Sequence, residues 1–339
     1  MLRQFGLPHA ILQRGRHELS GFAGAAILEA LHSEAVSQAV DRALAWAAQP
    51  RHSIVTLADE TYPRLLLEIS DPPPLLYARG RSELLSRSAL AMVGSRNATQ
   101  QGEANAEALA RALSSAGLTI VSGLALGIDA AAHRGGLLGP GSTIAVLGTG
   151  IDTVYPSRNA ALAAEIAERG LLLSEFPLGV GPAAQNFPRR NRLISGLARG
   201  CLVVEAALAS GSLITARAAA EQGREVFAIP GSIHSPLSKG CHALIKSGAK
   251  LVESADDVLS ELSGFRPSGF ASTQQPSARA DSGLLAHMGH DPVDVDSLCS
   301  RAGLSAEQVS SELLKLELDG RVAALPGGLY QRLEKGQSR

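Results

Sequence analysis

Short apolar runs alternate with amphipathic segments over most of the chain. Such runs are typical of strands that are buried on both faces of a parallel sheet. The segments between them carry apolar residues at helical spacing, which predicts helices packed on that sheet. In chain order the predicted strands are ALAMVG (89–94), LTIVSG (118–123), TIAVLG (143–148), LLLSEF (171–176), CLVVEA (201–206) and EVFAIP (225–230). The pattern therefore predicts an α/β fold with a parallel sheet covered by helices on both faces.

The chain divides into four predicted parts. Residues 1–60 contain two segments with helical apolar spacing and are predicted to form a small helical domain of the SAM or helix-hairpin kind. Residues 61–263 hold the alternating strands and helices and form the core. Residues 264–283 are rich in Pro, Ser, Gly and Gln, which predicts a flexible linker. Residues 284–335 contain two helical segments and a hairpin-like pattern, which predicts a winged-helix-like domain.

Charge limits the classes of function. The chain has 339 residues and a formal net charge of −1, which excludes a generally basic nucleic-acid coat but allows a local patch. Residues 185–250 contain nine Lys or Arg and three Glu, so the positive charge is concentrated there. Solvated helix surface is the other interpretation of this segment.

No pattern for membrane insertion, export or metal binding is seen in the sequence. No apolar run reaches the roughly 18 residues that a bilayer span needs, and the N-terminal residues lack a secretory signal pattern. Cys201, Cys241 and Cys299 are odd in number and widely spaced, which argues against a disulfide framework or a zinc site. We therefore expect a soluble cytoplasmic protein without a metal or cofactor.

Two loops at the carboxyl ends of predicted strands have the composition of anion-binding loops. Gly94, Ser95 and Arg96 follow the first of these strands, and Gly211 and Ser212 begin a later helix. Small residues let backbone N–H groups approach an anion, and a helix N-terminus adds positive potential. Tight strand-to-helix turns require glycine as well, so each loop alone is weak support. The sequence contains no GxxxxGK[ST] motif of a P-loop NTPase.

The segment FPRRNR places an aromatic residue beside three arginines. Phe187 precedes Arg189, Arg190 and Arg192 at the start of a predicted helix. Single-stranded nucleic acids are held by basic grooves and aromatic stacking platforms, so this segment is a candidate DNA-binding site. Two alternatives stay open at this point. In the first, Phe187 is a core residue. In the second, Arg190 or Arg192 pairs with an internal carboxylate, Glu175 or Glu205.

Candidate catalytic groups are sparse. His133 lies on a predicted helix and is as well explained by a structural role as by a role as a base. The acidic residues near strand ends show no spacing that acid–base chemistry requires, and we expect them to anchor loops; they are Asp129, Asp152, Glu175 and Glu205.

Six motifs in a fixed order resemble those of the bacterial DNA-processing protein A family (DprA or Smf). They are VGSRNAT, SGLALGIDAAAH, TIAVLGTGID..YP, FPRRNRLISGLA, SGSLITA and GCHALIKSGA, and the resemblance covers about residues 60–335. It implies an extended Rossmann-like core that binds single-stranded DNA and forms a homodimer. It also implies a recombination mediator that protects incoming DNA and loads the RecA recombinase during natural transformation, without catalysing a reaction.

The resemblance also assigns roles to residues. Arg96 corresponds to a phosphate-binding residue and Phe187 to a base-stacking residue, with the following arginines near the strand. Ser122, Gly123, Gly211 and Ser212 would line the same groove. The chain departs from the family at Leu126, where many relatives have Lys or Arg, and at His242, where Asn is common. The first departure puts one phosphate contact in doubt.

Two other classes of function compete with this interpretation. Related Rossmann-like proteins bind nucleotides or hydrolyse nucleoside monophosphates, but IPGSIHSPLSKG at the corresponding place lacks their PGGxGTxxE-type motif. A protein-binding adaptor is the other alternative, because the predicted second helix of the tail is acidic. Within 297–320 the acids Glu307, Glu312, Glu317 and Asp319 exceed the cations Arg301 and Lys315.

Overall fold

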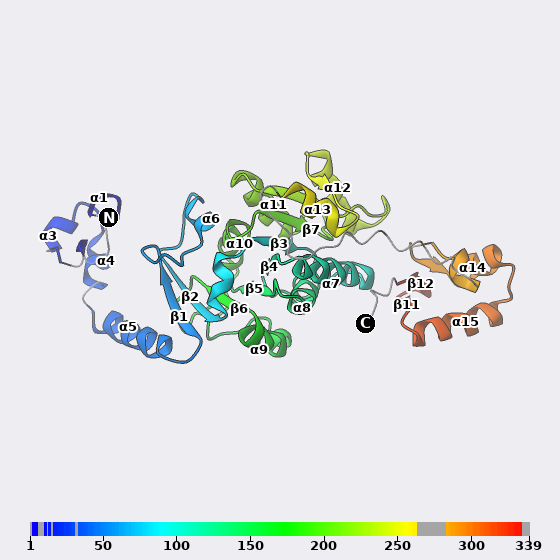
Figure 1. Ribbon diagram of the computed structural model, residues 1–339, viewed down its shortest axis with the longest axis horizontal. Coiled ribbons are helices and arrows are strands. Elements are labelled where there is room, and N and C mark those ends of the chain that lie inside the picture. The colour runs from blue at the N-terminus through cyan, green and yellow to red at the C-terminus, as the bar shows by residue number, and fades with distance from the viewer. Residues whose placement is uncertain are drawn as a thin grey trace.

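The computed structural model describes most of the chain and is shown in Figure 1. The described residues are 2–5, 10, 11, 13, 14, 16–30, 33–262, 283–289 and 291–333.

A nine-stranded sheet forms the centre of the core, in the order β1-β2-β6-β5-β4-β3-β7-β8-β9. The strands from β6 to β9 in this order run parallel to one another, whereas β2 is antiparallel to both β6 and β1. The predicted parallel α/β sheet is confirmed, and the six predicted apolar runs correspond to β3 through β8. The strand bounds are β1 (His52–Thr56), β2 (Leu75–Gly80), β3 (Ala89–Val93), β4 (Thr119–Ser122), β5 (Thr143–Val146), β6 (Leu171–Ser174), β7 (Gly200–Val203), β8 (Glu225–Ala228) and β9 (Lys250–Leu251).

The direction in which the sheet grows reverses between β3 and β7. From β3 the chain builds outward through β4, β5 and β6, and it then returns to place β7 on the other side of β3. The loops that leave β3 and β7 therefore separate at the carboxyl edge of the sheet. Open α/β sheets bind ligands in the crevice at such a switch point.

Helices cover both faces of the sheet, as predicted. Alternate residues of β3 enter different apolar clusters, Ala89 and Ala91 on one face and Leu90 and Met92 on the other, because successive strand side chains point to opposite faces. In Figure 1, α7, α8 and α9 lie on one side of the strands and α11 and α12 on the other. The helix bounds are α6 (Arg64–Leu67), α7 (Gln100–Ser115), α8 (Ile128–Leu137), α9 (Ala160–Arg169), α10 (Asn186–Gly196), α11 (Ser212–Glu221), α12 (Lys239–Lys246) and α13 (Ala255–Glu261). Short 3-10 turns lie at η1 (Ser82–Ser86), η2 (Ser157–Asn159) and η3 (Pro236–Ser238).

The N-terminal part differs from the prediction at its boundary. The described helices are α1 (Leu2–Phe5), α3 (Arg16–Leu19), α4 (Ala25–Ala30) and α5 (Glu34–Ala47). Residues 52–56, placed within the helical domain by the sequence, instead form β1 at the edge of the large sheet. The helical part therefore ends at α5, and the chain joins the core before residue 60. The segment HSIVT is short and only half-buried, so it lacks the continuous apolar run that marks the central strands.

The C-terminal part has its own small core. It contains η4 (Gly283–His287), β10 (Val293–Asp294), α14 (Val295–Ala302), α15 (Ala306–Leu318), β11 (Val322–Leu325) and β12 (Leu329–Arg332). The three strands form an antiparallel sheet beside the two helices, which confirms the winged-helix arrangement. Its apolar residues form a separate cluster that includes Leu298, Val309 and Leu313. Within the predicted linker, residues 264–282 lie outside the described residues, and Gly283 begins η4.

A close approach between α7 and α8 generates a stability prediction. A Cβ added at Gly135 would lie against the carbonyl oxygen of Glu107, well inside van der Waals contact. We expect Gly135→Ala to lower the free energy of unfolding by about 1–3 kcal/mol, because the helices must separate. Gly181→Ala is the matched control, since nothing lies within 4 Å of its Cβ position. Equal stability of the two variants in urea unfolding would contradict this packing.

Candidate nucleic-acid interface

A cavity of about 500 Å³ opens at the switch point between β3 and β7. Its walls come from the loop after β3, the loop after β7, and the first turns of α10 and α11. Seven of the predicted site residues line it: Gly94, Ser95, Arg96, Phe187, Arg190, Gly211 and Ser212. The structure therefore brings together two loops that are more than a hundred positions apart in the sequence.

The loop after β3 is fastened to the end of β7 by Glu205. The Glu205 carboxylate accepts hydrogen bonds from the Thr99 backbone N–H at 2.9 Å and the Thr99 hydroxyl at 2.6 Å, and its carbonyl accepts from Ser95 N at 2.8 Å. Burial raises the pKa of Glu205, and the Thr99 hydrogen bonds oppose that rise. Glycine is required at position 94, because a Cβ there would lie only 2.6 Å from Ile128 Cγ1. These contacts hold the loop in one conformation, and Glu205 anchors a loop as predicted.

The first turn of α11 forms the opposite wall of the cavity. Gly211 precedes the helix, and nothing lies within 4 Å of its Cβ position, so the backbone is open at this point. The Ser210 and Ser212 hydroxyls lie 2.7 Å apart, and the Ser210 hydroxyl also accepts from Ser212 N at 3.3 Å. Backbone N–H groups and hydroxyls thus gather at the amino end of a helix, which favours an anion.

An aromatic and a cation lie together at the cavity. Phe187 is half-buried, and a Cβ at Gly148 would lie 2.8 Å from its ring, so the ring rests on that glycine. The Arg96 guanidinium lies 5.8 Å from the centre of the Phe187 ring. Arg96 is exposed and forms no ion pair with any described residue. The Tyr155 ring lies beside the Phe187 ring, with the ring centroids 5.6 Å apart and the planes inclined by 42°. Phe187 is therefore a cavity residue, and the alternative that it belongs to the core is not supported.

Arg190 points inward from α10, and only 5% of its surface is exposed. One of its nitrogens donates to the carbonyls of Gly123, at 2.6 Å, and Val146, at the ends of β4 and β5. Burial lowers the pKa of Arg190 to about 10, and the nearby Asp129 carboxylate opposes that fall. Arg190 thus closes the cavity floor and is held by the protein itself.

Ser122 and Gly123 lie beneath the cavity wall, which differs from the expectation that they line the groove. Ser122 is fully buried and donates to the carbonyl of Met92 at 2.7 Å. Gly123 N donates to Asp129 Oδ2 at 3.1 Å, and its carbonyl accepts from Arg190. Their contribution to DNA binding stays a prediction, and the contacts favour a supporting role.

The loop that follows Gly123 is held by three buried side chains. Asp129 accepts from the N–H groups of Gly123 and Ala125, His133 Nε2 accepts from Leu124 N at 3.3 Å, and Asn159 donates to two carbonyls of the loop. His133 Nδ1 lies 2.7 Å from the Thr143 hydroxyl, which itself donates to a carbonyl, so Nδ1 carries the proton. These contacts and its full burial explain His133 as a structural residue.

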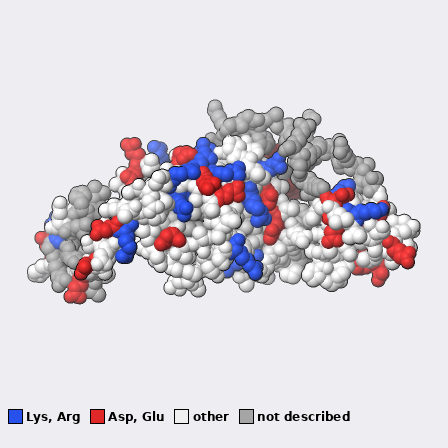
Figure 2. All heavy atoms as spheres, turned by 90° about the horizontal axis from the view of Figure 1, so that it is seen from below, with Lys and Arg blue, Asp and Glu red and all other residues white. Residues whose placement is uncertain are grey.

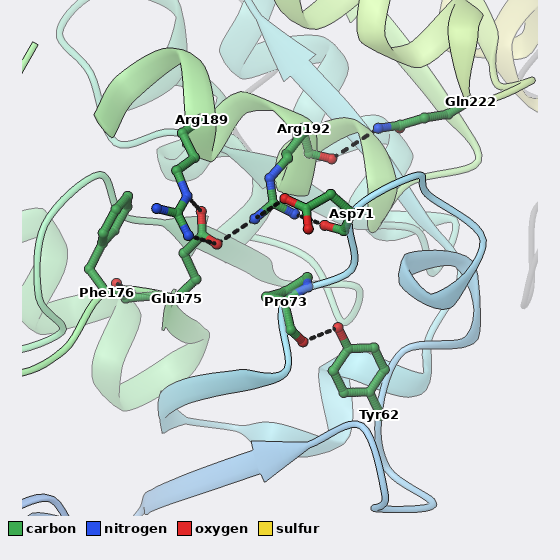
Figure 3. Close-up of polar contacts among 9 residues, drawn as sticks. Tyr62, Asp71, Pro73, Glu175, Phe176, Arg189, Arg192 and Gln222 are labelled. Carbon is green, nitrogen blue, oxygen red and sulfur yellow. Dashed lines mark hydrogen bonds and ion pairs between the residues drawn. The ribbon is translucent and has the colours of Figure 1, made fainter. Parts of the chain in front are cut away.

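Arg189 and Arg192 are not among the residues that line the cavity, and both converge on Glu175 (Figure 3). Arg192 pairs with both Glu175 and Asp71, and Arg189 lies 3.3 Å from Glu175. Arg189 also lies 5.5 Å from the centre of the Phe176 ring. Burial raises the pKa of Glu175, and the two arginines oppose that rise. The alternative that Arg192 pairs with an internal carboxylate is confirmed, and neither arginine lines the cavity.

The remaining surface charge is mixed. On the face of the molecule that Figure 2 draws, Lys and Arg side chains over the core lie beside Asp and Glu side chains. Arg224 pairs with Glu68 and Lys250 pairs with Glu261, so several cations of 185–250 have internal partners. The residues described contain no cluster of three His, Cys, Asp or Glu side chains suited to a metal ion. Their helices also include none that is long and apolar enough to cross a bilayer.

The core of the chain matches the model of a known protein family. The family model of DNA recombination-mediator protein A matches residues 53–263, the part that holds the sheet and the cavity. The chain belongs to this family. The model of the DprA winged helix domain matches residues 269–328.

Relatives and solved structures agree with this membership. The chain is 46% identical over 307 residues to Protein Smf of Escherichia coli K12, which covers 88% of this chain and 82% of the relative. It is 50% identical over 206 residues to DNA processing protein DprA of Streptococcus pneumoniae R6, covering 61% of this chain and 73% of that protein. The X-ray structure of DprA from Streptococcus pneumoniae aligns with a TM-score of 0.66 at 45% identity, covering 74% of this chain and 86% of that one. A DprA structure from Helicobacter pylori, described for its single-stranded DNA binding mode, aligns with a TM-score of 0.56 at 32% identity, covering 61% and 94%.

Sequence reasoning missed two features of the cavity. It did not assign a role to Tyr155, although an aromatic residue after the strand TIAVLG was visible in the motif. It also did not connect Asp129 with Arg190, which both bind the backbone of Gly123 and interact electrostatically at the neighbouring ends of β4 and β5.

Burial of His133 predicts a pH dependence of stability. Burial lowers the pKa of His133 to about 3, so the unfolded chain binds a proton below pH 6.5 that the native chain does not bind. Stability from this residue therefore falls with falling pH, by at most about 1.4 kcal/mol per pH unit. The His133→Gln variant lacks this pH-dependent part of the free energy of unfolding. The difference in free energy of unfolding between wild type and variant should therefore be smaller at pH 5 than at pH 7. A constant difference in urea unfolding would contradict this, and the exposed His234→Gln should leave stability unchanged at each pH.

Proposed function

We propose that this chain binds single-stranded DNA at the cavity between β3 and β7 and acts as a recombination mediator. In this role it protects incoming DNA and loads the RecA recombinase during natural transformation, as a homodimer in the cytoplasm and without catalysing a reaction. Membership of the DNA recombination-mediator protein A family supports the general role.

One observation carries the DNA-binding part of this proposal. Arg96 is a cation with no ion-pair partner among the described residues, and it lies beside the half-buried ring of Phe187 at a cavity lined by small, polar loops. Such a pair of groups suits one nucleotide of a strand: the cation binds a phosphate, and the aromatic face stacks on the adjacent base. Bases present their faces freely only in a single strand, so the arrangement favours single-stranded over duplex DNA.

The other site residues take different roles in this proposal. Gly94, Ser95, Gly211 and Ser212 line the cavity and provide polar groups for a phosphate. Arg190 forms the cavity floor, and Ser122 and Gly123 lie beneath it. The contacts of Arg189 and Arg192 with Glu175 fix α10, which carries Phe187. These residues therefore support binding mainly by holding the contacting groups in place.

A nucleotide-binding or nucleoside monophosphate-hydrolysing enzyme is the second candidate. Asp129 lines the cavity, and burial raises the pKa of this carboxyl, which are properties of a catalytic acid. One of its oxygens, however, accepts hydrogen bonds from the N–H groups of Gly123 and Ala125. These contacts explain Asp129 as a loop anchor, and they favour binding over catalysis.

The binding site is tested by fluorescence anisotropy with single- and double-stranded oligonucleotides over a salt series. The wild type should prefer the single strand. Arg96→Ala should weaken binding and make the slope of log K against log salt shallower by about 0.7, because one phosphate contact is lost. Phe187→Ala should weaken binding about five- to 150-fold with an unchanged slope, because stacking is worth about 1–3 kcal/mol per base.

Arg134→Ala is the matched control for lost charge. Arg134 lies in the last turn of α8 and pairs with Glu103 and Glu107, so its removal should leave DNA affinity unchanged. Absence of single-strand binding by the wild type at low salt would overturn the proposal. Release of a base from a nucleoside monophosphate would then favour the enzyme.

Loading of RecA is tested on single-stranded DNA coated with single-strand-binding protein. The wild type should shorten the lag of RecA filament formation, and Arg96→Ala should lose this effect in proportion to its loss of DNA affinity. A variant that lacks residues 284–339 keeps the cavity, because the winged helix has its own core. If that variant binds DNA but no longer loads RecA, the tail is the partner surface. An unchanged lag with the wild type would contradict the loading role.

A further inference from the structure

Tyr155 is an aromatic residue that the core does not use. It follows β5, and its side chain is 47% exposed. The preceding Val154 packs against the apolar cluster beside β5 and β6, whereas Tyr155 lies outside every core cluster of the described residues. Within the described part of the chain its hydroxyl has no hydrogen-bond partner. Apart from its contact with the Phe187 ring, no packing or hydrogen bond among the described residues explains this side chain.

The Tyr155 ring extends the row of planar groups that begins at Arg96. The Arg96 guanidinium lies 5.8 Å from the Phe187 ring centre, and the Tyr155 ring lies 5.6 Å from the same ring. The planes of Phe187 and Tyr155 are inclined by 42°, so the two rings are not stacked face to face and do not cover each other. Three side chains from three segments of the chain thus lie in a row, with Phe187 of α10 between Arg96 at the cavity wall and Tyr155 after β5.

The loop that carries Tyr155 is fixed on both sides. The Thr149 hydroxyl donates to the Thr153 carbonyl at 2.6 Å before it. Asn159 donates to the carbonyls of Leu124 and Ala125 at 2.9 and 3.1 Å after it. The backbone that carries the ring is therefore held in place before any ligand binds, so little backbone entropy is lost when a base stacks on the ring.

We propose that Tyr155 is a second stacking platform, which takes the base next to the one on Phe187. The proposal rests on the proposed single-strand binding and extends it from one base to two consecutive bases. The ligand is a single strand with at least two neighbouring bases, because one nucleotide cannot cover both rings. The ring of Tyr155 is the group required, and its hydroxyl is not.

The test compares Tyr155→Leu and Tyr155→Phe in full-length protein, with two oligomers of equal length. One oligomer is oligo(dT), and the other has the same phosphates but abasic sugars throughout. Tyr155→Leu should weaken binding of oligo(dT) about five- to 150-fold, the effect of one lost stacking contact. It should leave the affinity for the abasic oligomer and the salt slope unchanged. Tyr155→Phe should bind oligo(dT) as the wild type does, because the ring is kept.

Each other outcome overturns a specific statement. Unchanged oligo(dT) binding by Tyr155→Leu, with weakened binding by Phe187→Ala, would remove the second platform and leave the proposed function standing. Equal losses on both oligomers would show that Tyr155 acts through the shape of the loop and not by stacking. Absence of oligo(dT) binding by the wild type would overturn the proposed function itself.

Discussion

The cavity depends on one buried cation. Arg190 lies between the carboxyl ends of β4 and β5, where it donates to two backbone carbonyls and faces the Asp129 carboxylate. Burying a guanidinium costs several kcal/mol unless its charge and its N–H groups are matched, so the position of α10 is tightly determined by these partners. Because Phe187 lies on the same helix, the network beneath the cavity determines the position of the Phe187 ring.

Much of the positive charge near the cavity is already neutralised by the protein. Glu175 forms ion pairs with both Arg189 and Arg192, and the Asp129 carboxylate lies near Arg190. Arg96 is therefore the cation that is both exposed and part of the cavity wall. The cavity wall therefore offers an aromatic face and small polar loop residues as well as charge. This agrees with a chain whose net charge is only −1.

Preorganisation is the common property of the loops around the cavity. Glu205 holds the loop after β3, and Asp129, His133 and Asn159 hold the loop after β4. Loops fixed in the free protein lose little entropy on binding, so more of the contact energy appears as affinity. The loops of this cavity are therefore positioned before any ligand binds, because buried side chains hold them on the edge of the parallel sheet.

The sequence by itself determined the central strands, the loops beside them and the family. Continuous apolar runs mark strands that are buried on both faces, which is why the pattern predicted β3 through β8. Only the tertiary structure decided that β1 joins the sheet, since an edge strand is half-exposed and has no continuous apolar run. It also decided that Arg190 points inward and Arg192 toward Glu175, and that Tyr155 meets Phe187. Those partners lie on strands and helices far apart in the chain, and the order of strands in the sheet, set by non-local packing, brings them together.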